Sequence, residues 1–136
     1  LHGRCTPDRT REIVCRADVF TLFSDFEGMP MSLLEALGAG CIPLVYEMDS
    51  GLDDFIEQGV NGHVCCSRTV EEAVRVVAGL VDPTARRHMR MAARQLLDAR
   101  GLTADAMADA YADVIGPALQ QSCTESFERP RWIHTR

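Results

Sequence analysis

The sequence lacks the features of several special classes of protein. No apolar run approaches the ~18 residues that cross a membrane, aromatic residues make up only 6%, and the formal net charge is −6. Because phosphate binding needs a basic face, this acidic balance argues against nucleic acid as the main partner. What remains is one soluble domain of 136 residues, of which 46% are hydrophobic, enough to bury a core.

The six cysteines also lack a C-x-x-C pair, so we expect free thiols in a reducing cytoplasm. His63, Cys65 and Cys66 in "GHVCC" could be taken for metal ligands. Adjacent residues on a strand point to opposite faces, however, which keeps Cys65 and Cys66 from sharing one ion. We therefore predict neither a metal site nor a cofactor.

The chain begins with "LHG" rather than with a methionine or a signal peptide. Because "LHG" looks like the end of a strand, we expect a piece of a longer chain, and a missing targeting signal then excludes nothing. The last residues, "ESFERPRWIHTR", lose helical periodicity. We expect residues 1–120 to form one part of a domain and residues 121–136 to be a tail or linker.

Strand and helix patterns alternate along the first half of the chain. The expected strands are an end at 1–3, then 18–23, 41–46 and 63–66, and the expected helices are 7–17, 30–40, 49–58, 69–81, 83–101 and 103–119. This alternation is typical of parallel, right-handed βαβ units with helices on both faces of a sheet. We therefore predict an α/β fold, a partial doubly wound (Rossmann-like) parallel sheet with C-terminal helices.

Local signals place two helix starts and one face of a helix. Thr6 followed by Pro7 predicts an N-cap, and Thr69 with Glu72 predicts a capping box. The helix after that box carries an apolar stripe, Val70, Ala73, Val74 and Val77.

Arginines surround the apolar stripe of the next helix at positions 86, 87, 90 and 94. They could form an anion site or a solvated helix face, and we expect the second.

Two glutamates frame the stretch "SDFEGMPMSLLEALGAG". Glu27 lies in a loop after a predicted strand, and Glu35 lies five residues past Pro30, roughly 7.5 Å along the predicted helix. The start of that helix offers free backbone amides to a diphosphate, and Gly28 lets a ligand approach closely. A ligand with hydroxyl-bearing sugars on both sides of a diphosphate could meet one carboxylate at each end. A loop charge and a solvated helix position are the structural alternative.

The stretch from Ala17 to Val64 resembles the C-terminal domain of the retaining glycosyltransferases of family 4, which have the GT-B fold. The resemblance rests on an ordered set of residues: Asp18, Ser24, Glu27-Gly28, Glu35-Ala36, Gly40 with Pro43, Gly51, and Gly59-Val60-Asn61-Gly62. Seven residues separate the two glutamates, as in the family pattern. The match is detailed over residues 1–66 and looser in the C-terminal helices, where Tyr111 falls at a position that often carries tyrosine.

The resemblance implies that residues 1–120 are the C-terminal part of a donor-binding domain in an enzyme that transfers a hexose with retention. Glu27 would hold the hexose at the reaction centre, and Glu35 the ribose. The other donor-binding positions would be Gly28, Met29, Pro30 and Met31. Pro30 departs from the glycine of many relatives and removes one backbone donor.

The same resemblance implies partners and a location. The donor would be a nucleotide sugar, the acceptor a sugar, a lipid or another glycan, and an N-terminal domain missing here would complete the cleft. The isolated chain would then be inactive and could self-associate through an exposed sheet edge. We expect the cytoplasm, or alternatively the membrane surface. The alternative functions are a catalytically silent sugar-nucleotide-binding or interaction domain and a GT-B nucleotide-sugar epimerase, and the glutamate pair favours the transferase.

Overall fold

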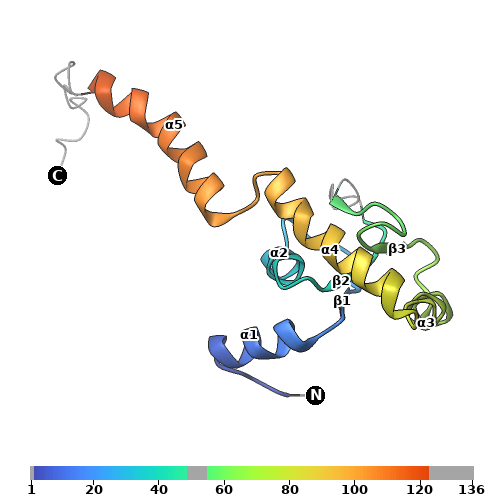
Figure 1. Cartoon of the computed structure of the whole chain (residues 1–136). Helices are drawn as coiled ribbons and strands as arrows, with labels where there is room; N and C mark the ends of the chain where they lie inside the picture. Colours follow the sequence, from blue (N-terminus) through green and yellow to red (C-terminus); the bar gives the residue numbers. More distant parts are fainter. Residues whose placement is uncertain (1, 49–54, 123–136) are drawn as a thin grey trace, which may run out of the picture. The chain divides into compact units, whose positions relative to one another are not determined.

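The computed structural model describes residues 2–48 and 55–122, with side chains up to residue 119. The chain divides into two units, Leu1–Arg100 and Gly101–Arg136. The first holds α1 (Pro7–Arg16), β1 (Val19–Leu22), α2 (Met31–Gly38), β2 (Ile42–Tyr46), β3 (His63–Cys65), α3 (Val70–Gly79) and α4 (Pro83–Ala99) (Figure 1). The second holds α5 (Ala104–Ser122).

The three strands form one parallel sheet in the order β1-β2-β3. Val19 pairs with Ile42, and Leu44 pairs with His63, so β2 is the central strand. The predicted α/β fold with a partial Rossmann-like sheet is therefore confirmed. The apolar run of β2 is buried because helices cover both faces of a parallel sheet.

The core has a layer on each face of the sheet. On one face α2 and α4 pack together, and Leu33, Leu37 and Ala93 form a buried cluster with Phe20 and Leu22 of β1. On the other face α3 lies against β3, and its Ala73 packs with Leu44 and Cys65. This two-sided cover is the arrangement that the alternation of elements predicts.

Two helix starts follow the sequence prediction, with one change. The Thr6 hydroxyl accepts a hydrogen bond from the Arg9 amide, and the Thr69 hydroxyl accepts one from the Glu72 amide. The Glu72 carboxylate, however, does not close a capping box. It accepts bonds from the amide and the hydroxyl of Ser67, at 2.8 and 2.5 Å, which hold the pKa of Glu72 below its usual value.

The apolar stripe of α3 is less covered than its pattern suggests. Ala73 is buried, but Val70, Val74 and Val77 are 70%, 59% and 46% exposed. These valines border an open apolar hollow over the sheet, with residues of β1 and β2 and the following Phe23 on its opposite side. The stripe thus lies on one face as predicted, although the described chain brings nothing to cover it.

The remaining predictions meet the structure as follows. His2 and Gly3 are not in a strand, because no strand within residues 2–48 and 55–122 pairs with them; residue 1 lies outside these ranges. Residues 49–54 of the expected helix 49–58 and residues 123–136 of the expected tail also lie outside them. Residues 55–58 form no α-helix, and Gln58 instead bridges to Gly62, so the helix prediction is wrong there. Residues 121 and 122 continue α5 rather than starting a tail. Pro30 is the N-cap of α2 rather than its first residue, because its ψ of 105° is extended. No helix among the described residues is long and apolar enough to cross a membrane.

Candidate functional site

The loop after β1 carries Glu27 in a fixed position. Glu27 is half-buried, and its Oε1 accepts a hydrogen bond from the Ser24 hydroxyl at 2.7 Å. Both residues follow the carboxyl end of β1, the edge at which open parallel sheets bind ligands. Glu27 is therefore an oriented carboxylate rather than a free loop charge.

The N-terminus of α2 follows directly and is uncapped. Pro30, buried at the N-cap position, offers no side-chain acceptor, and the first turn contains no acidic residue. The first amides of a helix have no partner within the helix, and its dipole makes this end positive. Glu27 therefore lies in the loop directly before an end of α2 that can bind an anion.

Gly28 and Met29, between Glu27 and this helix, are exposed, as is Met31 in its first turn. A Cβ atom placed on Gly28 would meet no described atom within 4 Å, and its φ lies outside the left-handed region. Neither packing nor backbone conformation in the described chain requires glycine at this position. A ligand that approaches the backbone closely would require it.

Glu35 lies on the exposed side of α2, one wall of a hollow of about 530 Å³ between α1 and α2. Cys5, Thr10 and Arg11 line the opposite wall. Glu27 does not reach this hollow. The described residues thus place Glu27 before the start of α2 and Glu35 in its second half, and they do not bring the two carboxylates into one shared cavity.

Arg68 is a residue of this edge that the sequence analysis did not identify. Its guanidinium donates to Asp25 Oδ1 at 3.0 Å and to the Glu47 carbonyl at 2.7 Å. It also lies 5.7 Å from the ring centre of Tyr46. Arg68 therefore ties the loop that contains Glu27 to the end of β2. One signal could have identified it, because loops after parallel strands gather at one edge and Arg68 follows β3.

Another part of the family pattern, Gly59-Val60-Asn61-Gly62, holds the fold rather than the site. The buried Asn61 side chain accepts from the Glu57 amide at 2.8 Å and donates to the Phe55 carbonyl at 3.1 Å. Gly59 has a φ of +76°, and a Cβ on Gly62 would lie 2.5 Å from Pro43 Cγ. The G-V-N-G segment is therefore a turn packed against β2.

The "GHVCC" segment shows the alternation expected of a strand. Cys65 is buried and Cys66 is exposed, and burial raises the pKa of the Cys65 thiol. Burial also lowers the pKa of His63, whose Nδ1 has no hydrogen-bond partner among the described residues. Within residues 2–48 and 55–122, no group of three or more His, Cys, Asp and Glu side chains is placed to hold a metal ion.

Comparison with known families agrees with this geometry. The model of the family described as glycosyl transferases group 1 matches residues 1–96, which is more than half of the 136 residues. No curated protein matches the chain. The family match spans the whole sheet, the loop of Glu27, and α2 with Glu35. An open parallel sheet with an uncapped helix after β1, together with this match, shows that the chain belongs to the glycosyl transferases group 1 family.

Proposed function

We propose that this chain is the donor-binding part of a retaining glycosyltransferase with the GT-B fold. The donor is a nucleoside diphosphate sugar, and the acceptor is a sugar, a lipid or another glycan bound largely by an N-terminal domain. The family supports glycosyl transfer from a donor to an acceptor. The arrangement of the carboxyl edge of the sheet supports the choice of donor.

The observation that carries the proposal is the uncapped start of α2 beside a glycine that the fold does not require. A diphosphate fits there because the helix offers free amides and a positive dipole end. Gly28 leaves room for the ligand against the backbone. The backbones of Met29, Pro30 and Met31 continue this surface.

The two glutamates then bind opposite ends of the donor. Glu35 accepts hydrogen bonds from the vicinal hydroxyls of the ribose in the hollow between α1 and α2. Glu27, held by Ser24, accepts hydrogen bonds from the hexose. Charge-assisted bonds of this kind are stronger than neutral ones and fix the orientation of the sugar.

The chemistry of the site follows from charge. When the bond between hexose and diphosphate breaks, negative charge grows on the leaving phosphate and positive charge grows on the hexose ring. The N-terminus of α2 stabilises the first, and the Glu27 carboxylate stabilises the second. Arg68 acts indirectly, because it holds Asp25 and the end of β2 and so positions the loop of Glu27.

A silent sugar-nucleotide-binding domain is the second candidate. It is favoured by one observation: the hollow that contains Glu35 does not include Glu27. A nucleotide could therefore be held in this hollow without any contact to the carboxylate that we assign to the reaction. Turnover separates the two candidates.

Titration calorimetry with UDP, GDP and ADP, in buffer with EDTA, tests the binding step. We expect one of the three to bind the chain, and Glu35→Ala to weaken it, whereas the control Glu71→Ala on exposed α3 leaves it unchanged. Binding that EDTA abolishes and Mn²⁺ restores would contradict a site made of backbone amides. The full-length protein, assayed for hexose transfer and for hydrolysis of the donor, should show turnover. Binding without turnover supports the silent domain.

A further inference from the structure

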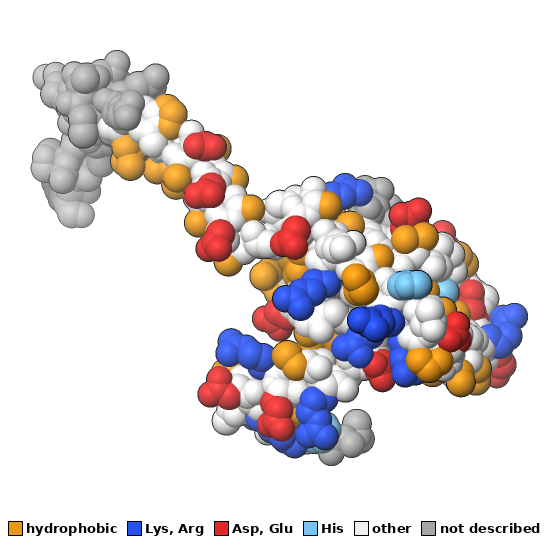
Figure 2. Space-filling view, in the orientation of Figure 1, with side chains coloured by type: hydrophobic (Ala, Val, Ile, Leu, Met, Phe, Trp, Pro, Cys, Tyr) orange, Lys and Arg blue, Asp and Glu red, His pale blue; other side chains and the backbone are white. Residues whose placement is uncertain are grey.

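Four arginines of α4 gather at the opposite end of the sheet from Glu27. Arg86, Arg87, Arg90 and Arg94 line a hollow of about 400 Å³, together with Ala39 and Gly40 at the end of α2. Figure 2 shows blue side chains gathered beside α4 on the visible face. The chain has 14 basic residues, all of them arginine, and a net charge of −6. The hollow is therefore locally positive, although the chain as a whole carries a net negative charge.

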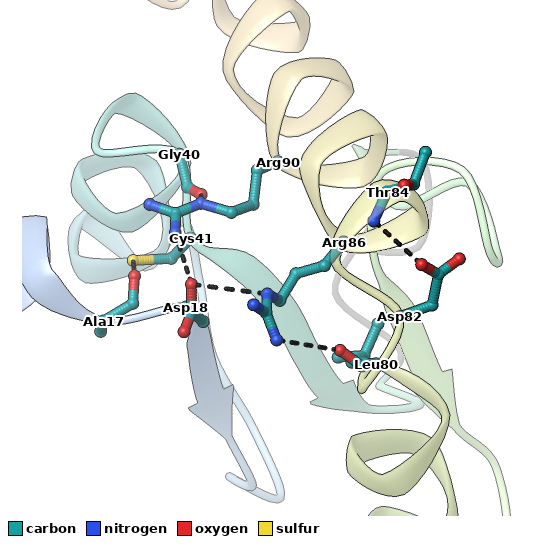
Figure 3. Close-up of polar contacts among 9 residues, drawn as sticks. All are labelled: Ala17, Asp18, Gly40, Cys41, Leu80, Asp82, Thr84, Arg86 and Arg90. Carbon is teal, nitrogen blue, oxygen red and sulfur yellow. Dashed lines mark hydrogen bonds and ion pairs between the residues drawn. The ribbon is translucent and has the colours of Figure 1, made fainter.

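Two of the four arginines are held in place by described residues. Arg90 forms an ion pair with Asp18, and its Nε donates to the Gly40 carbonyl at 2.8 Å (Figure 3). The Nη1 of Arg86 donates to the Leu80 carbonyl at 3.2 Å, and its Nε lies 3.9 Å from Asp18. Their side chains are only one third exposed. The expectation of a freely solvated helix face is therefore wrong for these two residues.

The other two, Arg87 and Arg94, are exposed, and no residue of the described ranges forms an ion pair with them. Among the described residues that line the hollow, Asp18 is the only acidic one, so four guanidinium groups face one carboxylate. Arg86, Arg90 and Arg94 follow each other at intervals of four, a spacing at which like charges destabilise a helix. Asp18 offsets part of this cost at Arg86 and Arg90, but no described acid pairs with Arg87 or Arg94. Unpaired like charges that cost stability are typical of a functional site.

The hollow lies away from Glu27 and the start of α2, although it borders the hollow that contains Glu35. Asp18 directly precedes β1 and Gly40 lies just before β2, so these residues mark the amino ends of the strands. Glu27 follows the carboxyl end of β1, about 13 Å away along four residues at ~3.3 Å each. The hollow meets the one that contains Glu35 at Ala39, but the two share no charged side chain.

We propose that this arginine-lined hollow binds the phosphate group of a phosphate monoester or a diphosphate. Arginine presents a planar fork of donors that matches phosphate oxygens in pairs, which a lysine does not. Arg86 and Arg90 form the ordered floor, and Arg87 and Arg94 supply unpaired donors at the rim. The phosphate comes either from a soluble phosphorylated compound or from the headgroup of an anionic lipid.

The test uses a double variant that leaves the floor intact. Arg87→Gln/Arg94→Gln removes the two unpaired charges, and Arg4→Gln/Arg75→Gln is a control with the same charge change at exposed positions outside this hollow. Pyrophosphate is titrated into each protein, and binding is followed by amide chemical shifts. Co-sedimentation with vesicles of phosphatidylcholine, with and without phosphatidylglycerol, is measured in parallel.

We expect pyrophosphate to shift the amides of residues 86–94, and the first double variant to weaken this binding at least about tenfold while the control changes it less than about twofold. Such a result assigns a soluble phosphate ligand. Sedimentation that depends on phosphatidylglycerol and is lost only in the first double variant, without pyrophosphate binding, assigns a lipid headgroup. Shifts confined to residues 28–34, equal losses in both variants, or no binding of either probe would overturn the proposal. Both variants should remain folded, since all four side chains are exposed and none has a described ion-pair partner. The first double variant should be no less stable than the wild type, because it removes like charges from α4.

Discussion

Gly28→Ala tests whether glycine at this position is required for ligand binding or for the stability of the fold. A methyl group at this position meets no described atom within 4 Å, and the backbone is not in the left-handed region. The substitution should therefore leave the free energy of unfolding unchanged or raise it by about 0.4–1 kcal/mol, because alanine restricts the unfolded chain.

The same methyl group would stand where we place the donor. Forcing an extra carbon into a tight contact costs about 1–3 kcal/mol, which corresponds to a loss of about 5- to 150-fold in affinity. Urea unfolding gives the first quantity, and calorimetry with the nucleoside diphosphate sugar of the nucleotide that binds gives the second. The expected signature is a loss of donor binding in a protein that is as stable as the wild type.

Gly62→Ala is the matched control for this prediction. Its Cβ would lie 2.5 Å from Pro43 Cγ and 2.9 Å from the Pro43 carbonyl oxygen, and the backbone of a central strand cannot easily move. We expect a loss of about 1–3 kcal/mol in the free energy of unfolding. The reasoning fails if Gly28→Ala destabilises the protein as much as Gly62→Ala does, or if it leaves donor binding unchanged.

Three further predictions concern the loop, pH and the sheet edge. Arg68→Ala should lower turnover of the full-length protein more than it lowers nucleotide affinity, because it frees the loop of Glu27 from Glu47; equal losses would contradict this. Burial lowers the pKa of His63, so as the pH falls the unfolded state takes up a proton before the folded state does. The free energy of unfolding should therefore fall as the pH drops below about 6.5. His63→Leu should flatten this slope in urea titrations, and an unchanged slope would assign it to other groups. The unpaired edge of β1 should cause self-association, which a monomer across micromolar concentrations in sedimentation would refute.

Local signals in the sequence were sufficient to predict most of the sheet. The apolar run that became β2, the stops at glycine and the threonine caps each depend on a few neighbouring residues, and the order of parallel strands follows from the connections between them. The loop of Glu27 and the start of α2 could be placed for the same reason, because they follow β1 directly.

Contacts across long stretches of sequence were not predictable. Arg68 reaches Asp25 over 43 positions, and Arg90 reaches Asp18 over 72. No local pattern shows which of many arginines will pair with which carboxylate. The pairing depends on how α4 packs against the sheet and on where the loop after β3 runs. The exposure of the α3 valines has the same origin: their spacing shows an apolar face but not what lies opposite it.

The central claim is that Glu35 and Glu27 bind opposite ends of one donor, and the two alanine variants of the full-length protein test it most directly. Glu35→Ala should weaken binding of the nucleoside diphosphate by about 10- to 150-fold, the equivalent of roughly 1.5–3 kcal/mol for charge-assisted bonds to the ribose. Glu27→Ala should leave that affinity within a few-fold, because no hexose is present, and should lower turnover instead. Calorimetry and initial rates on the same preparations measure both. Equal losses of nucleotide affinity in the two variants, or no loss of affinity or rate in either, would contradict the account.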